Sequence, residues 1–339
     1  MTSTSISLRC IGRRADTHDV TSWQFVAAEG TLPPVLAGQC VTLHTEIDGQ
    51  PLCRAYTLSS SPQDACWQVT IKDVGLVSHH LHQSMQVGDE IRADGPFGDF
   101  NLTALPCERP LLLSAGSGIT PMWAMLRDEL AKRPYVDIRF IHSARSPEDV
   151  IFADELAALA EAHAGLRHAL VLERVLEEAP AAHPWLGRLT PSMLKELAPD
   201  LLDRHVYLCG PAPYMAAVST MLAELGLPAT QLHQESFGLP VVTSDAAPVA
   251  AGGDHFWLTL KKSGKKVKIL PGQTLLAALE GAGETMMAAC RAGVCGACRC
   301  TTTGEIERQS VVTLSPQDLE SGVALACSCT AKGDVGLDY

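Results

Sequence analysis

The sequence predicts a multidomain protein with a small antiparallel β-barrel, an α/β domain built on a parallel sheet, and a cysteine-rich α+β unit at the C-terminal end. Three observations predict this order. The chain has 339 residues, which is too long for one ordinary hydrophobic core. Short strand-like segments give way near Arg109 to strands that alternate with helices. Six of the 12 cysteines lie between Cys290 and Cys329.

Composition and charge exclude several classes of protein. Hydrophobic residues make up 46% of the chain and charged residues 19%, so the chain is neither disordered nor a coiled coil. The net charge of −12 would repel phosphate backbones, so we expect no nucleic-acid partner. No run of about 18 apolar residues occurs, so we expect no membrane span. The opening MTSTSISLRC lacks the features of a secretory signal, so the 12 cysteines indicate metal or redox use in a cytoplasmic protein.

Residues 1–104 are predicted to form the antiparallel barrel. Short segments rich in β-branched and aromatic residues recur at regular spacing, and turn-forming residues separate them. Several strands at such spacing are typical of a small barrel. The strand segments are WQFVAA, CVTLHTEI, CRAYTLSS and CWQVTIKDV.

Residues 105–237 are predicted to form the α/β domain. The segment from Arg109 to Arg133 is typical of a buried strand, a glycine turn and an amphipathic helix. Strands that alternate with helices indicate a parallel sheet covered on both faces. The further strand segments are VDIRFIHSAR, HALVLERV and HVYLCG.

Residues 238–253 are rich in Gly, Ala, Pro and Ser and are predicted to be a linker. The C-terminal unit, 254–339, begins with a strand, a glycine turn, a second strand and a short helix. This unit holds nine Lys and Arg and nine Asp and Glu, so the rest of the chain carries the whole net charge of −12.

The cysteine loop has the spacing of an iron–sulfur site. Cys290, Cys295 and Cys298 form a C-x4-C-x2-C pattern, and Cys327 or Cys329 offers a fourth thiolate. This spacing is typical of plant-type [2Fe–2S] sites, in which one tight loop supplies most of the thiolates. A zinc site or a set of buried structural thiols is the alternative. Zinc sites usually combine paired short spacings, and no second C-x2-C or histidine pair follows.

This region resembles the plant-type ferredoxin domains. The matching strings are CRAGVCGAC, LAC at 325–327 and GDV at 333–335. The resemblance implies a β-grasp fold, assigns the fourth ligand to Cys327, and leaves Cys300 and Cys329 as bystanders. Gly293 and Gly296 would let the loop bend closely and aim N–H groups at the sulfurs.

A glycine turn after the first strand of the α/β domain is suited to a dinucleotide. Gly116 and Gly118 would let a diphosphate approach the backbone, and the start of the next helix favours its charge. The turn departs from the usual Rossmann fingerprint, because Pro121 replaces the third glycine and no acidic residue ends the second strand. That strand ends instead at Arg145, a candidate for contact with the adenosine part; a solvated loop arginine is the alternative.

The segment from Arg54 to Ser60 has side chains suited to a flavin. Arg54 can neutralise a phosphate, the ring of Tyr56 can pack on a flavin, and the hydroxyl of Thr57 can bond near its reactive nitrogen. When this segment is taken alone, an ordinary half-buried strand is the alternative.

Together and in this order, these segments resemble the ferredoxin–NADP reductase superfamily. The matching motifs are RAYT at 54–57, VTIK followed by GLVS at 75–78, GPFGDF at 95–100, GSGITPM at 116–122 and CGPAPYM at 209–215. The resemblance implies an FAD domain, a nicotinamide domain and a C-terminal ferredoxin. The cofactor-binding residues that it implies are Arg54, Ala55, Tyr56, Thr57, Ser60, Lys72, Gly75, Ser78, Gly116, Gly118, Thr120, Pro121, Arg145, Gly210, Pro211 and Met215.

The resemblance also implies a reaction. A hydride from NADH would reach FAD beside Cys209, with Thr57 and Glu235 near the flavin, and the [2Fe–2S] cluster would pass single electrons to a partner protein. A buried apolar cysteine is the alternative for Cys209, and a surface carboxylate is the alternative for Glu235. We expect NADH rather than NADPH, because a 2′-phosphate needs several cations and only Arg145 is evident near the end of the second strand.

The partner is expected to be a redox acceptor protein. The strings RSPEDVIFADE, LCGPAPYM, CRAGVCGAC and LACSC resemble the reductases that serve hybrid cluster protein, which makes that protein the favoured acceptor. An oxygenase component is the second candidate, because reductases of Rieske-type and other oxygenases share this layout. An iron–sulfur redox sensor is the alternative from another class, but a sensor needs no hydride donor.

Overall fold

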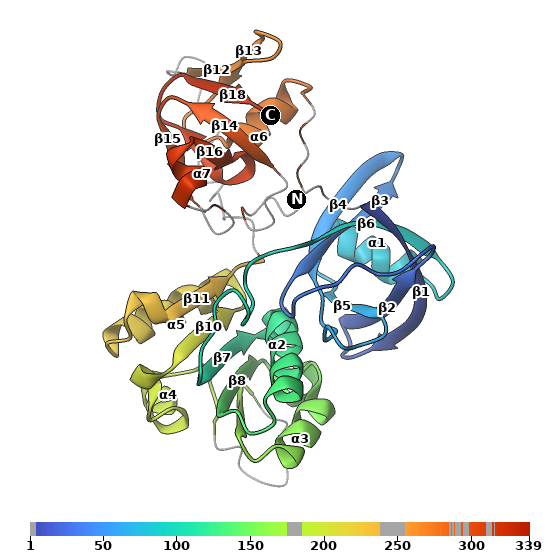
Figure 1. The fold of residues 1–339 in the computed structure, drawn as a ribbon, viewed down its shortest axis with the longest axis vertical. Coiled ribbons are helices and arrows are strands. Elements are labelled where there is room, and N and C mark those ends of the chain that lie inside the picture. The colour runs from blue at the N-terminus through green and yellow to red at the C-terminus, as the bar shows by residue number, and fades with distance from the viewer. Residues whose placement is uncertain are drawn as a thin grey trace. The chain divides into compact units, whose positions relative to one another are not determined.

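The computed structural model of the protein describes residues 5–174, 185–237, 255–284, 298–309 and 316–339, together with positions 286, 288, 293 and 314 (Figure 1). The chain divides into two compact units, Met1–Ser236 and Phe237–Tyr339. The first unit contains an antiparallel sheet and a parallel sheet, and the second contains a mixed sheet. The predicted multidomain fold class is confirmed.

The antiparallel barrel is a six-stranded sheet with the order β4-β3-β6-β1-β2-β5. The end strands of this order meet where Leu58, just after β4, pairs with Val69 of β5, so the sheet curls into a barrel. Alternate side chains, including Trp23, Phe25 and Leu43, fill its core. The elements are β1 Ser5–Ala15, β2 Val20–Ala27, β3 Cys40–Ile47, β4 Gln50–Thr57, β5 Trp67–Lys72, α1 Leu76–Ser84 and β6 Glu90–Phe97.

Four of these strands, β2 to β5, correspond to the predicted strand segments, and β1 and β6 complete the sheet. The apolar residues of β1 and β6 are separated by charged residues such as Arg9 and Arg92, which weakens their signal in the sequence. Both strands are central in the sheet, because β1 pairs with β6 and β6 also pairs with β3.

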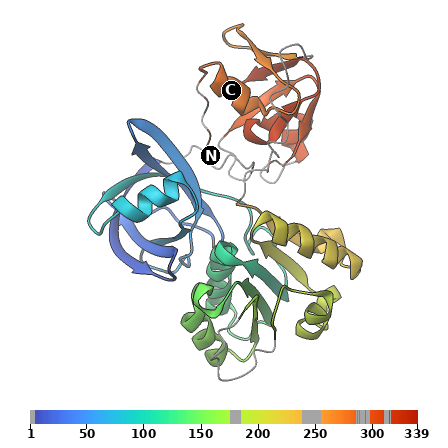
Figure 2. The same ribbon diagram turned by 180° about the vertical axis from the view of Figure 1, so that it is seen from behind.

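The parallel sheet has the order β11-β10-β7-β8-β9. In β7, Leu112 packs into the core with α2 and α3, whereas Leu111 and Leu113 pack into the core with α4 and α5. Helices therefore cover both faces of the sheet, as the alternating pattern predicted (Figure 1, Figure 2). The elements are β7 Pro110–Ala115, α2 Ile119–Lys132, β8 Ile138–Ala144, α3 Ala153–Ala162, β9 Leu166–Leu172, α4 Pro191–Leu197, β10 His205–Cys209, α5 Ala212–Glu224 and β11 Leu232–Glu235.

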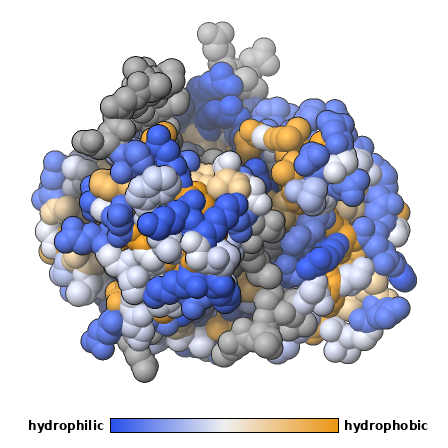
Figure 3. Space-filling model, turned by 90° about the horizontal axis from the view of Figure 1, so that it is seen from above, coloured by the Kyte–Doolittle hydropathy of each residue, from blue (hydrophilic) through white to orange (hydrophobic). Residues whose placement is uncertain are grey.

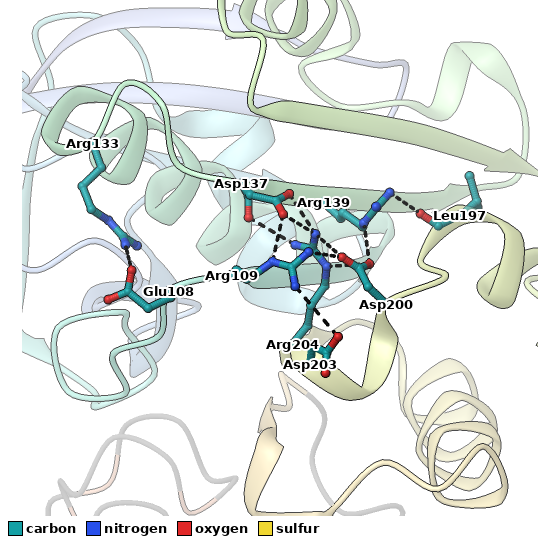
Figure 4. Close-up of polar contacts among 9 residues, drawn as sticks. All are labelled: Glu108, Arg109, Arg133, Asp137, Arg139, Leu197, Asp200, Asp203 and Arg204. Carbon is teal, nitrogen blue, oxygen red and sulfur yellow. Dashed lines mark hydrogen bonds and ion pairs between the residues drawn. The ribbon is translucent and has the colours of Figure 1, made fainter.

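An ion network ties together the N-terminal ends of β7, β8 and β10 (Figure 4). The side chain of Arg204 is 0% exposed and lies 2.7 Å from Asp137 Oδ2 and 2.8 Å from Asp200 Oδ2. Arg109 Nε lies 2.9 Å from Asp137 Oδ2, and Arg139 Nε lies 3.0 Å from Asp200 Oδ1. Hydrogen bonds from Arg204 hold the pKa of Asp200 well below its usual value. The network stabilises the edge at which the parallel strands begin, which is opposite the edge at which they end.

The second unit is built on a five-stranded mixed sheet with the order β13-β12-β18-β14-β16. The predicted strand–turn–strand is the β12–β13 hairpin, and the predicted short helix is α6, which packs into the same core. The elements are β12 Phe256–Leu260, β13 Lys266–Ile269, α6 Leu275–Gly281, β14 Arg299–Thr303, β15 Ile306–Arg308, α7 Pro316–Glu320, β16 Val323–Leu325, β17 Cys329–Ala331 and β18 Val335–Asp338.

The surface is mixed in character. On the face drawn in Figure 3, hydrophobic side chains are scattered between hydrophilic ones. Two of the most exposed large hydrophobic side chains, Val74 and Tyr135, belong to different loops. Among the described residues, none of the helices is both long and apolar enough to span a membrane.

Candidate functional site

The candidate site lies at the edge where the parallel strands end. From β7 the chain continues to β8 and β9 on one side of the sheet, and it later adds β10 and β11 on the other side. The loops after β7 and β10 therefore leave the same edge in opposite directions, and open α/β sheets bind ligands in the crevice that this creates. The predicted glycine turn follows β7, and the predicted Cys209-Gly210-Pro211 segment ends β10.

The two predicted motifs meet at Gly118. A Cβ atom on Gly118 would lie 2.3 Å from the carbonyl oxygen of Cys209 and 2.6 Å from the backbone nitrogen of Gly210. No real side chain tolerates such distances, so the two turns can approach this closely only because residue 118 is glycine.

The glycine turn leads directly into α2. Gly116 has a φ of +51°, in the left-handed region that favours glycine. Thr120 Oγ1 donates a hydrogen bond to the carbonyl of Ser117 at 3.1 Å, and Pro121 is buried in the first turn of the helix. The first N–H groups of a helix have no partner within the helix, so this start is suited to hold a phosphate.

A cavity of about 450 Å³ opens beside these turns. Gly116, Ser143, Pro211 and Tyr214 contribute to its lining. Burial raises the pKa of Tyr214, with Ser143 near enough to act in the opposite direction. Ser143 Oγ and Tyr214 Oη are therefore buried close to each other at the cavity wall. The volume and the mixed polar and apolar lining are suited to a nucleotide.

Not every predicted residue reaches this cavity. Met215 packs into the hydrophobic core behind α5, whereas Ser143 and Tyr214, which were not predicted, line the cavity. Both lie inside segments that were predicted to contact the dinucleotide, HSAR at 142–145 and CGPAPYM at 209–215. The alternation of side chains along a strand or helix decides which residue of a motif faces the ligand.

Charged side chains line the cavity in pairs of opposite charge. Lys72 Nζ lies 3.0 Å from Asp19 Oδ2, and Arg145 Nη2 lies 2.8 Å from Asp149 Oδ1. Arg188 Nε lies 3.3 Å from Glu173 Oε1. Lys72 and Arg145 were predicted to bind cofactor, whereas the other members were not, although Asp149 lies within the string RSPEDVIFADE. The charged lining residues are Lys72, Arg145, Asp149, Glu173 and Arg188.

Cys209 lies between two polar residues on neighbouring strands. It pairs with Ser114 of β7 on one side and with Glu235 of β11 on the other. Cys209 is 0% exposed and Glu235 is 5% exposed. Burial raises the pKa of the Cys209 thiol well above its ordinary value, and Glu235 raises it further. The thiol is therefore neutral at neutral pH, and it cannot serve as a base.

A buried histidine stands next to this group. His142 Nδ1 shares a 2.8 Å hydrogen bond with Ser114 Oγ, and burial lowers the pKa of His142 to about 4. His142 Nε2 has no hydrogen-bond partner among the residues described. The sheet edge thus presents a neutral imidazole and a neutral thiol.

The predicted flavin strand is β4. Tyr56 packs against the barrel core, and burial raises its pKa to about 12, with Arg54 acting in the opposite direction. Arg54 Nη1 donates a hydrogen bond of 2.7 Å to a backbone carbonyl of the same strand. Thr57 ends the strand with a buried side chain, and Ser60 Oγ accepts the N–H of Gln68 at 3.0 Å. The residues predicted to bind the flavin therefore lie on one continuous segment. They are Arg54, Ala55, Tyr56, Thr57 and Ser60.

The second predicted flavin segment forms the start of α1. Ser78 Oγ accepts hydrogen bonds from the N–H groups of Val74 at 3.1 Å and Gly75 at 2.9 Å, and it donates one to the Gly75 carbonyl at 2.9 Å. One hydroxyl therefore holds the turn from which α1 begins. The remaining free N–H groups of such a turn are suited to a diphosphate.

Two of the four predicted cluster ligands, Cys298 and Cys327, are described, whereas Cys290 and Cys295 lie outside the described residues. The N–H of Gly293 donates to Cys327 Sγ at 3.2 Å, and the N–H of Cys327 donates to Cys298 Sγ at 3.5 Å. Backbone hydrogen bonds to sulfur are the surroundings that iron–sulfur clusters have in proteins. These two sulfurs therefore fit a cluster.

The two neighbouring cysteines have other surroundings. Cys300 Sγ donates to the carbonyl of Ala324 at 3.5 Å inside the sheet. Cys329 is 0% exposed and belongs to β17, opposite Arg308 of β15. Both thiols are thus held by the core of the unit.

Three parts of the chain match known families. Residues 16–102 match the oxidoreductase FAD-binding domain, residues 112–220 match the oxidoreductase NAD-binding domain, and residues 258–332 match the 2Fe-2S iron–sulfur cluster binding domain. The expected cofactor classes are thereby confirmed, in the expected order along the chain.

Whole proteins match over nearly the full length. The glycine betaine monooxygenase reductase subunit of Pseudomonas aeruginosa is 37% identical over 98% of this chain and 94% of that protein. NADH oxidoreductase HCR of Escherichia coli is 36% identical over 90% of this chain and 89% of that protein. The solved structure of phthalate dioxygenase reductase has the same fold, with a TM-score of 0.62 and 23% identity over 99% of this chain and 98% of that chain.

Proposed function

The chain belongs to the FAD- and NAD-dependent oxidoreductases that carry a [2Fe–2S] domain, and we propose that it oxidises NADH and delivers the electrons to an oxygenase component. As a member of this family it is an electron-transfer reductase. The observation that carries the proposal is the meeting of the glycine turn with the Cys209 turn at Gly118. Such a crevice serves a dinucleotide, and a protein that only sensed redox state would need no dinucleotide.

We propose that FAD binds to residues of the barrel. When bound, FAD and the cluster supply the change from two-electron to one-electron transfer, which side chains alone cannot perform. Arg54 neutralises the diphosphate, Tyr56 and Thr57 orient the ring system, and Ser78 holds the α1 turn that receives the phosphates. These residues belong to the predicted domain 1–104.

The nicotinamide side lies in the predicted domain 105–237. The turn at Gly116 and Gly118 holds the diphosphate, and the ring reaches the edge where Cys209 and Glu235 end their strands. Cys209 contributes an apolar, neutral contact that excludes water, because burial keeps its thiol protonated. Ser143 and Tyr214 hydrogen-bond to the nucleotide from the cavity wall.

The cluster belongs to the predicted domain 254–339, which follows the predicted linker 238–253; the linker lies outside the described residues. We assign its ligands as Cys290, Cys295, Cys298 and Cys327. The hydrogen bonds that join Gly293, Cys327 and Cys298 support the choice of Cys327 over Cys329.

The choice of partner reverses the order expected from the sequence motifs. The relative in Pseudomonas aeruginosa is named as the reductase subunit of a monooxygenase, and it matches 98% of this chain. Hybrid cluster protein becomes the second candidate, and NADH oxidoreductase HCR, which matches 90% of the chain, is the relative that favours it.

The test measures electron delivery by the purified, cofactor-loaded chain. We expect NADH to reduce its FAD and cluster, and then to reduce a purified oxygenase component of the betaine monooxygenase type faster than purified hybrid cluster protein. The Cys298→Ser variant should still reduce ferricyanide but should lose transfer to the oxygenase component. Transfer to hybrid cluster protein alone would replace the first candidate by the second, and absence of FAD reduction by NADH would refute both.

A further inference from the structure

An arginine that lines the nucleotide cavity is paired with a carboxylate from the flavin barrel. Asp19 lies in the turn between β1 and β2, yet its Oδ2 atom lies 3.6 Å from Nη2 of Arg145, which follows β8 of the parallel sheet. The same Arg145 nitrogen lies 2.8 Å from Asp149 Oδ1. Two carboxylates from two different sheets therefore flank one arginine that lines the cavity.

Both carboxylates are held in place by further hydrogen bonds. Asp19 Oδ1 accepts the hydroxyl of Thr17 at 3.0 Å, and the Asp19 carbonyl accepts the N–H of Asp73 at 2.8 Å. Asp149 Oδ2 accepts the hydroxyl of Ser146 at 2.9 Å. The two carboxylates therefore do not depend on the arginine alone for their positions.

The charges at this rim cancel. Lys72, Arg145 and Arg188 carry three positive charges, and each lies within 3.6 Å of a carboxylate of Asp19, Asp149 or Glu173. His18 lies on the same cluster, with Nε2 3.6 Å from Asp19 and Nδ1 3.9 Å from Asp149. The rim therefore lacks the excess of positive charge that a phosphate group needs.

The charge balance matters for nucleotide binding because of where Arg145 lies. In dinucleotide folds, the residue at the end of the second strand meets the 2′ position of the adenosine ribose, where NADPH carries a phosphate and NADH a hydroxyl. A phosphate bound at Arg145 would lie beside Asp149 and Asp19, and both carboxylates would repel its charge of about −2. A ribose hydroxyl can instead donate a hydrogen bond to a carboxylate.

We propose that Asp19 and Asp149 determine the choice of nucleotide by neutralising Arg145 and repelling a 2′-phosphate, so that the flavin barrel takes part in selecting NADH. This inference rests on the proposed function, because it concerns the nucleotide that the reductase uses.

The test replaces each carboxylate by an amide of the same shape. We expect Asp19→Asn and Asp149→Asn each to raise the ratio of kcat/KM for NADPH over NADH about fivefold to tenfold, as loss of one nearby charge in a half-exposed site would do. A second measurement uses calorimetry with 5′-AMP and 2′,5′-ADP, which needs no electron transfer. The affinity for 2′,5′-ADP relative to 5′-AMP should rise by a similar factor.

Asp64→Asn is the matched control. Asp64 of the barrel also pairs with an arginine of the α/β domain, Arg127 of α2, at 2.6 Å. Neither of these two residues lines the nucleotide cavity. The control should leave both ratios unchanged. Ratios that stay constant in Asp19→Asn, or that rise equally in Asp64→Asn, would overturn the inference. Failure of NADH to reduce FAD in the unaltered protein would instead refute the proposed function, and the calorimetric ratio would still decide the role of Asp19.

Discussion

The backbone carbonyl of Cys209 occupies the space that a side chain on Gly118 would need. A Cβ atom there would lie 2.3 Å from the carbonyl oxygen. The loops after β7 and β10 are thereby packed against each other at the point where the order of the strands reverses. The shape of the proposed nucleotide crevice depends on this contact.

We therefore expect Gly118→Ala to disturb the crevice. The added methyl group must push the two turns apart, which should cost about 1–3 kcal/mol of stability. Reduction of FAD by NADH should slow at least about tenfold, because small errors of position are costly in transfer reactions. Stopped-flow absorbance of the flavin measures this rate. Gly281→Ala is the control, because nothing lies within 4 Å of its Cβ position, and a normal rate in Gly118→Ala would contradict the proposed crevice.

The start of α1 offers a test of the FAD site. Ser78→Ala removes the hydroxyl that accepts the N–H groups of Val74 and Gly75. We expect FAD to bind about tenfold more weakly, because the turn loses hydrogen bonds that are each worth about 0.5–1.5 kcal/mol. FAD retained per chain after dilution measures this loss. Ser84→Ala, at the other end of α1, removes a hydrogen bond to the His80 carbonyl and should leave FAD content unchanged. Equal FAD content in the two variants would argue against the site.

The cluster assignment is tested by comparing neighbouring cysteines. Cys327→Ser should abolish or strongly disturb the visible absorption of the cluster and lower the iron content. The reason is that Cys327 Sγ accepts the N–H of Gly293 beside Cys298. Cys329→Ala and Cys300→Ala should keep both signals, because Cys300 Sγ donates to the carbonyl of Ala324 and Cys329 lies on β17 opposite Arg308. Loss of iron in Cys329→Ala with retention in Cys327→Ser would reverse the assignment.

The thiol of Cys209 should be inert in the folded protein. Alkylating reagents attack the thiolate, and burial with Glu235 beside it raises the pKa of Cys209 well above the ordinary value. We expect iodoacetamide at neutral pH to leave Cys209 unmodified while the part-exposed Cys53 reacts, as read by peptide mass spectrometry. Modification of Cys209 as fast as Cys53 would show that the site opens more than the structure allows.

The ion network at the opposite sheet edge should control stability. Arg204→Met removes the buried member of the network, but Arg109 and Arg139 still pair with Asp137 and Asp200, so the loss should be about 1–3 kcal/mol. Hydrogen exchange of the β10 amides measures the loss. Arg9→Met, which breaks an exposed pair with Glu90, should leave β10 protection unchanged.

The same network predicts a dependence on pH. Arg204 lowers the pKa of Asp200, so its contribution to stability is complete above the unfolded pKa of about 4 and is lost as the pH falls towards the lower folded value. The difference in β10 protection between the normal chain and Arg204→Met should therefore be constant between pH 7 and pH 5 and shrink below about pH 4. A difference that persists unchanged at lower pH would exclude this ionic origin.

The sequence by itself determined the features that depend on spacing along the chain. The glycine turn at 116–118, the strand β3 and the C-x4-C-x2-C loop are each contained in a few consecutive residues. Their periodicity and turn residues are local, so they can be read without knowledge of neighbours. The order of these segments then indicated the three domain families that the chain matches.

Only the tertiary structure decided which distant residues meet. Nothing in the sequence brings Asp19 to Arg145 or marks Tyr214 and Ser143 as lining one cavity. Spacing left Cys327 and Cys329 as equal candidates, and only the fold shows that the N–H of Gly293 donates to the sulfur of Cys327, which supports the proposal of Cys327. Arginine side chains are mostly exposed in proteins, yet the packing of β7, β8 and β10 buries Arg204 among carboxylates. The physical reason is that a residue's burial and electrostatic partners are set by non-local packing, which a local pattern does not encode.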